Sequence, residues 1–170
     1  MRSLAWLAFL VVLLVGSGWT TGILAQTNES PEERAVAELA QEFLEALSAS
    51  DTAVLASLLA PQAMIYSVRE GDEGPSLGVR PRDSFLQSIG GDEQSFLERM
   101  WNPTAMVQGR VAMVWTPFDF HLNGEFSHCG TNVFTFLKGD EGWQVASITY
   151  NVVRDDCPPS PLGPPGGRRR

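Results

Sequence analysis

The chain has 170 residues, 44% of them hydrophobic, and a formal net charge of −8 at pH 7. This length suits one domain with a single hydrophobic core. The acidic balance argues against nucleic-acid binding, because a protein that binds nucleic acid needs a basic face to neutralise phosphates. We therefore expect one folded domain and no nucleic-acid partner.

Residues 1–25 predict a secretory signal peptide. Arg2 gives a positive start, Leu4 to Val15 is an unbroken apolar run, residues 16–21 are small and polar, and Ala25 suits cleavage before Gln26. The run is short for a membrane span, which needs about 20 apolar residues. We expect cleavage near Ala25, export to the periplasm or out of the cell, and no stable membrane span afterwards. An uncleaved membrane anchor is the alternative.

Two helices are expected next. Ser30 is a suitable N-cap, Pro31 the first helical residue, and Glu33 completes a capping box. Apolar residues then recur at helical spacing as far as Leu47. A second helix begins after Asp51 and ends before a proline at position 61.

The middle of the chain predicts a strand over 63–69, a turn over 71–75 and a short helix over 81–89. Residues 98–107 suggest a strand that Asn102 and Pro103 interrupt. This order of helices followed by strands predicts an α+β domain.

A three-stranded antiparallel meander is predicted from Val111 onwards. Asn123 and Gly124 lie between two runs rich in β-branched and aromatic residues, which is the strongest short-range signal for a β-hairpin. A second turn over 139–142 leads to the last strand. Residues 158–170, rich in Pro, Gly and Arg, should form a disordered tail, so the domain itself spans 26–157.

The Asn123–Gly124 turn also predicts which side chains share a face. If Leu122 faces Glu125, Asp119 lies directly opposite His128, with the two Cβ atoms about 4.5–5.5 Å apart. An acid beside an imidazole is a candidate acid–base pair, so Asp119 and His128 are candidate catalytic residues. A purely structural pair that holds the hairpin together is the alternative.

The same register predicts a small-molecule pocket. Asn132, Thr149 and Asn151 would offer hydrogen bonds to a ligand at its polar end, and Trp115 would stack on the ligand. Large apolar groups with a few convergent polar ones are typical of ligand pockets. We expect an unknown small apolar molecule as the ligand. Core packing is the alternative role for Trp115.

The opposite face of the predicted sheet is apolar as well. It would carry Val114, Phe118, Val133, Ile148 and Tyr150. A sheet that is buried on both sides needs a second layer, and a partner subunit can supply it. We therefore expect a homodimer through this face.

The sequence leaves the state of the two cysteines open. Export permits a disulfide between Cys129 and Cys157. A straight last strand would put Cys157 roughly 16 Å too far along, whereas a disulfide needs Cα atoms within about 7 Å. The bridge therefore requires the chain to fold back over 154–156, and two free thiols are the alternative.

No metal or cofactor is expected. A metal site needs three or four convergent ligands, and His121 should point to the face opposite His128. A glycine-rich phosphate loop is also missing, since Gly90 and Gly91 precede no suitable helix.

The element order and the motifs V-W-T-P-F-D-F, N-G and S-H-C-G resemble the nuclear transport factor 2-like superfamily. The resemblance covers about residues 31–157. It is nearest to the SnoaL-like and ketosteroid-isomerase-like branches and to a bacterial group of exported members without an assigned function. It implies a cone-shaped fold, in which N-terminal helices cover a curved antiparallel sheet around a pocket, and dimers that often form through the outer sheet face.

The resemblance leaves the function open, because this superfamily includes dehydratases, isomerases, cyclases, hydrolases and adaptors on one scaffold. We expect an exported domain that binds a small molecule in an apolar pocket. The alternative is a small acid–base enzyme of the dehydratase, isomerase or cyclase type that uses Asp119 and His128 on an apolar, ring-sized substrate. A purely structural dimerisation module is a further alternative.

Overall fold

The computed structural model describes residues 29–71, 74–91 and 94–165. The predicted signal peptide and the last five residues of the predicted tail lie outside these ranges. The described elements are, in chain order, α1 (Pro31–Ser48), α2 (Thr52–Leu58), β1 (Leu59–Arg69), β2 (Ser76–Pro81), α3 (Arg82–Gly91), β3 (Phe96–Met100), β4 (Thr104–Gln108), β5 (Val111–Leu122), β6 (Glu125–Gly139) and β7 (Gly142–Val152).

The helix caps form as the sequence predicts. The Glu33 backbone N–H donates to the Ser30 hydroxyl at 3.2 Å, and the Ser30 backbone N–H donates to the Glu33 carboxylate at 2.7 Å. This is the expected capping box. The Asp51 carboxylate caps α2 by accepting hydrogen bonds from the backbone N–H groups of Ala53 and Val54. No helix in the described ranges is both long enough and apolar enough to cross a membrane.

The strands form one curved sheet in the order β2-β1-β7-β6-β5-β3, and β4 also pairs with β5. Strands β3 and β4 are two parts of one strand that breaks at Asn102–Pro103, as predicted, where Asn102 has a φ of 46°. Strands β1 and β7 run parallel, while the other pairs are antiparallel. The sequence does not predict β2, because its residues are mostly exposed and show no alternation.

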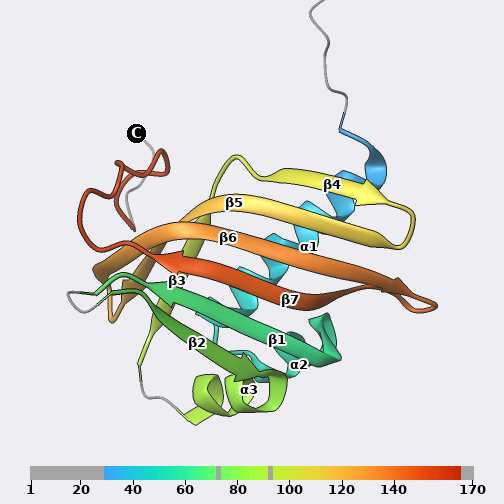
Figure 1. Cartoon of the computed structure of the whole chain (residues 1–170), viewed down its shortest axis with the longest axis horizontal. Helices are drawn as coiled ribbons and strands as arrows, with labels where there is room; N and C mark the ends of the chain where they lie inside the picture. The colour runs from blue at the N-terminus through green and yellow to red at the C-terminus, as the bar shows by residue number, and fades with distance from the viewer. Residues whose placement is uncertain (1–28, 72–73, 92–93, 166–170) are drawn as a thin grey trace, which may run out of the picture.

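The three helices cover one face of the sheet, with α1 running across it and α2 and α3 at the β1–β2 end (Figure 1). One stripe of α1 packs into the core against the inward side chains of the sheet. Its buried residues are Val36, Ala37, Ala40, Phe43, Leu44, Ala46 and Leu47. The predicted α+β cone is therefore confirmed.

The β5–β6 hairpin turns at Asn123–Gly124, as predicted, but its register then shifts. Leu122 pairs with Glu125, whereas Phe120 pairs with His128 and Asp119 pairs with Cys129. The extra residue, Ser127, forms a β-bulge. Because side chains alternate between faces, one extra residue moves the rest of β6 to the other face. The predicted pairing of Asp119 with His128 is therefore wrong.

The bulge also changes the face predicted for a homodimer. Val114, Phe118 and Ile148 are buried on the inner face, beneath the helices. Val133 lies on the outer face instead, opposite Trp115. The five residues predicted to form one interface therefore do not share a surface, so that part of the prediction is wrong. The homodimer itself stays a prediction.

Cys129 and Cys157 form a disulfide, with Cα atoms 5.9 Å apart. The backbones of Cys129 and Val153 pair in an isolated antiparallel β-bridge. The chain then folds back at Asp156, which has a φ of 60°. This is the reversal that the sequence requires for the bridge. It brings residues 157–165 beside β3 and β5. The predicted boundaries at 25 and 157 stay predictions.

Replacing both cysteines by alanine should lower the free energy of unfolding. The bridge joins residues 28 positions apart, and the chain-entropy model gives about 3–4 kcal/mol for a loop of this size. Urea unfolding with and without dithiothreitol measures the effect. The reduced wild type should fall to the level of the alanine variant, and the variant should not respond to reductant. Equal stability of the oxidised wild type and the variant would contradict the stabilising role.

Candidate functional site

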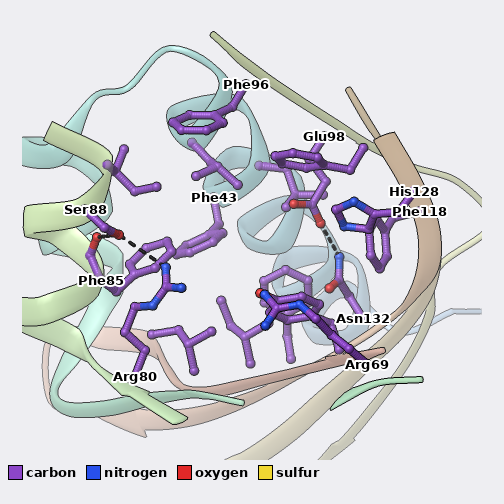
Figure 2. Close-up of a pocket in the computed structure, with 18 residues that line it drawn as sticks. Phe43, Arg69, Arg80, Phe85, Ser88, Phe96, Glu98, Phe118, His128 and Asn132 are labelled. Carbon is purple, nitrogen blue, oxygen red and sulfur yellow. Dashed lines mark hydrogen bonds between the residues drawn. The ribbon is translucent and has the colours of Figure 1, made fainter. Parts of the chain in front are cut away.

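A cavity lies between the helices and the inner face of the sheet (Figure 2). It has a volume of about 330 Å³, which is enough for a small organic molecule. Its walls are mostly aromatic and aliphatic. The apolar lining residues are Phe43, Leu44, Leu47, Ile65, Phe85, Ile89, Phe96, Phe118, Phe120, Phe134 and Ile148.

A few polar side chains enter this apolar space. Glu98 comes from β3, and His128 and Asn132 come from β6. Arg69 and Arg80 come from the neighbouring strands β1 and β2 (Figure 2). Apolar walls with a few placed polar groups are the usual composition of a ligand site.

Glu98 is held in place by Asn132. The Asn132 side-chain amide donates to the Glu98 carboxyl group at 2.6 Å, and Asn132 is almost fully buried. The Ser48 hydroxyl accepts from the Glu98 backbone N–H, which ties β3 to the end of α1. Burial raises the pKa of Glu98 to about 7, against the opposing effect of the Asn132 hydrogen bond. A carboxyl group with this pKa can both donate and accept a proton near neutral pH.

His128 is a neutral imidazole at pH 7. Burial lowers its pKa to about 4, and the positive charges of Arg154 and Arg69 act in the same direction. The ring stacks on Phe120 with the centroids 4.8 Å apart, and its edge packs against Phe118 at 5.7 Å. A neutral imidazole offers one hydrogen-bond donor and one acceptor, so His128 can orient a ligand.

The structure separates the predicted site residues. His128 and Asn132 line the cavity. Trp115 is on the outer face and 44% exposed, and Thr149 is exposed on the same face, opposite Val133. A second register shift lies between Thr135 and Phe136 in the pairing of β6 with β7. It turns the later side chains of β7 to the face opposite the predicted one.

Asn151 is also exposed, and its side-chain oxygen accepts from the backbone N–H of Thr131 at 2.7 Å. The predicted common face for Trp115, Asp119, His128 and Asn132 is therefore wrong. The two shifts account for it, because each reverses the direction of the side chains that follow it.

Asp119 belongs to a different cluster, on the outer side of β5. It accepts two hydrogen bonds from Arg99, at 2.8 and 2.6 Å, and lies 3.4 Å from the imidazole of His121. Burial alone would raise the pKa of Asp119, but hydrogen bonds from Arg99 and Ser160 and the nearby positive charges bring it below the usual value. The cluster ties β3, β5 and the C-terminal segment together.

The sequence analysis missed Glu98, Arg69 and Arg80. The strand predicted over 63–69 contains a signal for Arg69, because its alternation puts Arg69 on the same face as Ile65. Arg80 lies in β2, which was not predicted. Glu98 carries no local signal, since its position depends on how β3 pairs with β5.

The described residues contain no group of three or more His, Cys, Asp or Glu side chains placed to hold a metal ion. The residues that line the cavity offer hydrogen bonding, proton exchange by Glu98, and charge pairing by the two arginines.

A curved sheet that closes around an apolar cavity under three helices is the nuclear transport factor 2-like architecture. The chain belongs to the family described as "Putative lumazine-binding", whose profile matches residues 31–151. The superfamily predicted from the sequence is thereby confirmed, without a particular branch. A comparison with curated proteins finds no match.

Solved structures with this fold are distant in sequence. A nuclear transport factor 2-like protein from Cytophaga hutchinsonii is 9% identical, with a TM-score of 0.60 over 73% of this chain and 100% of the other. A protein from Streptomyces avermitilis, described as a putative dehydratase, is 18% identical, with a TM-score of 0.58 over 72% and 96% of the two chains. A superfamily member from Salmonella enterica is 15% identical, with a TM-score of 0.56 over 80% and 96%. At these identities the likeness concerns the fold.

Replacing Glu98 by Gln should change how stability depends on pH. The folded-state pKa of Glu98, about 7, is above its ordinary value of 4.5. Its contribution to stability is therefore fully present below about pH 4.5 and is lost as the pH rises through 7. Gln does not ionise. The free energy of unfolding of the variant, relative to that of the wild type, should therefore rise by about 2 kcal/mol between pH 5 and pH 8.

Urea unfolding at both pH values measures this gain. Glu141→Gln, at an exposed turn position, is the matched control and should follow the wild type. An E98Q variant with the same pH dependence as the wild type would contradict the raised pKa.

Proposed function

We propose that this protein is an exported domain that binds a small, apolar, ring-sized molecule in the cavity between its helices and sheet. The observation that supports this most directly is the cavity itself, about 330 Å³ in volume with phenylalanine on several walls. The description of the family names lumazine, a flat bicyclic ring of the size class that such a cavity can hold. Burial of ring surface would supply the binding energy.

The packing of the phenylalanines favours a preformed site. Phe43 on α1 stacks against Phe85 on α3, with centroids 5.9 Å apart, and meets Phe134 on β6 edge-on at 5.7 Å. These contacts link both helices to the sheet. A preformed site costs less ordering entropy on binding.

Two features support export. Residues 1–25 have the pattern of a signal peptide. The disulfide between Cys129 and Cys157 suits an oxidising compartment, since cytosolic thiols are kept reduced.

An acid–base enzyme is the second candidate, with Glu98 as its proton-exchanging group and His128 as an orienting group, in place of the Asp119–His128 pair. The observation that favours it is the pKa of Glu98, about 7, beside a neutral imidazole in the same cavity. A carboxyl group with a pKa near the working pH can act as general acid or general base. Loss of turnover in E98Q with ring binding retained would support this candidate, and unchanged turnover would exclude Glu98 from it.

The neutral fluorescent probe N-phenyl-1-naphthylamine should bind the cavity of the wild type. Ile89→Trp places a large side chain in the cavity wall and should weaken binding at least ten-fold. Leu137→Trp adds the same side chain on the outer face, where Leu137 is about half exposed, and should leave binding unchanged. Fluorescence titration gives the three dissociation constants, and thermal melts check the folds. Equal binding by both variants, or no binding by the folded wild type, would contradict the proposal.

A further inference from the structure

A small recess opens beside the main cavity, between β1 and β2. It has a volume of about 80 Å³ and is lined by Ser67, Arg69, Gly78, Arg80 and Tyr150, among others. Arg69, Arg80 and Tyr150 also line the main cavity, so the two spaces adjoin. A molecule with its ring in the cavity can therefore extend a short substituent into the recess.

The strand pairing explains why two arginines meet there. Ile65 pairs with Arg80 and Ser67 with Gly78, so Arg80 shares a face with Ile65. Arg69 follows two positions after Ser67 and points to the same side. Both guanidinium groups thus approach the inner face from adjacent strands, and Figure 2 shows them directed into the cavity.

Gly78 keeps the space between them open. A Cβ at this position would collide with the Ser67 hydroxyl and lie 3.9 Å from a terminal nitrogen of Arg69. The backbone there does not need glycine, since Gly78 is not among the glycines with positive φ. Glycine therefore leaves this space free beside a cationic group.

The two arginines in this part of the cavity form no ion pair with a carboxylate of the described residues. Arg34, Arg82, Arg99, Arg110 and Lys138 each form an ion pair with a carboxylate. Within the described ranges, neither Arg69 nor Arg80 has such a partner, and Arg80 donates only to the neutral hydroxyl of Ser88, at 3.2 Å. Both arginines are also exposed to solvent at the edge of the cavity, so an incoming anion can reach them.

We propose that this recess binds the carboxylate of a ligand whose apolar ring occupies the main cavity. The proposal rests on the proposed ligand-binding function and narrows the ligand to ring compounds with one carboxylate. The planar guanidinium group matches a planar carboxylate through paired hydrogen bonds. Ser67 and Tyr150 also line the recess, and hydroxyl groups of these residue types can donate hydrogen bonds to a carboxylate. Ring burial then supplies affinity, and the arginines supply selectivity for the anion.

A matched pair of probes tests the charge. 2-Naphthoate and 2-naphthamide share one ring system and differ in charge, and each is titrated against protein loaded with N-phenyl-1-naphthylamine. The wild type should bind the acid at least ten-fold more tightly than the amide. Arg80→Gln and Arg69→Gln should each weaken binding of the acid at least ten-fold and binding of the amide less than three-fold.

Two further variants control this test. Gly78→Ala keeps both charges but fills the recess, so it should also weaken binding of the acid selectively. Arg110→Gln removes an exposed arginine outside the cavity and should change neither affinity.

The outcomes separate the two proposals. Equal affinity of the wild type for acid and amide, or equal losses for both probes in the arginine variants, would overturn the carboxylate site. Binding of the neutral fluorescent probe would still support the proposed function in that case. A folded wild type that binds none of the three compounds would overturn both proposals.

Discussion

The β-bulge at Ser127 determines which side chains of β6 face the interior of this domain. Up to the bulge, β5 and β6 pair in the register that their turn sets, and beyond it every β6 side chain changes face. His128, Asn132, Phe134 and Phe136 thereby point towards α1. Without the bulge, the register that the turn sets would continue, so Thr131, Val133 and Thr135 would face inwards and Phe134 and Phe136 outwards, and the sheet could not enclose the same cavity.

The backbone is tightly packed just after the bulge. Gly130 faces Phe118, and a Cβ at position 130 would collide with the Asn151 carbonyl oxygen. The close approach of β5, β6 and β7 here leaves room only for glycine. The bulge and this glycine together fix the positions of His128 and Phe118 at one end of the cavity.

Side chains alternate between the two faces of the sheet along β3, so its two charged residues lie on opposite faces. Glu98 points inwards to Asn132, while Arg99 points outwards to Asp119. The inner carboxyl group sits in an apolar space and has a raised pKa, whereas the outer one is paired and has a lowered pKa. The outer cluster also holds the C-terminal segment that the disulfide returns to the sheet. One short strand thus serves both the stability of the fold and the chemistry of the site.

The sequence predicts those features that rest on local signals. The capping box at Ser30, the hairpin turn at Asn123–Gly124 and the break at Asn102–Pro103 all form as expected. The bulge at Ser127 lacks such a signal, because it is a feature of how β6 pairs with β5 and follows from no residue type at that position. The identity of the acid in the cavity therefore could not be predicted, and Glu98 takes the place expected for Asp119.

The disulfide and the two arginines also depend on contacts between distant segments, which local sequence signals do not predict. The bridge depends on a chain reversal at Asp156, and Arg80 depends on a strand that lacks an alternating pattern. The fold class follows from the order of elements, whereas the site follows from pairings between distant segments.

An isotope-filtered nuclear Overhauser spectrum of labelled protein with bound N-phenyl-1-naphthylamine tests the central claim most directly. The claim is that the bulge turns His128 and Asn132 into the ligand cavity and leaves Trp115 outside. The spectrum should contain contacts from the probe to the His128 ring and the Asn132 side chain, and none to the Trp115 indole. Contacts to the Trp115 indole without contacts to His128 would contradict the account.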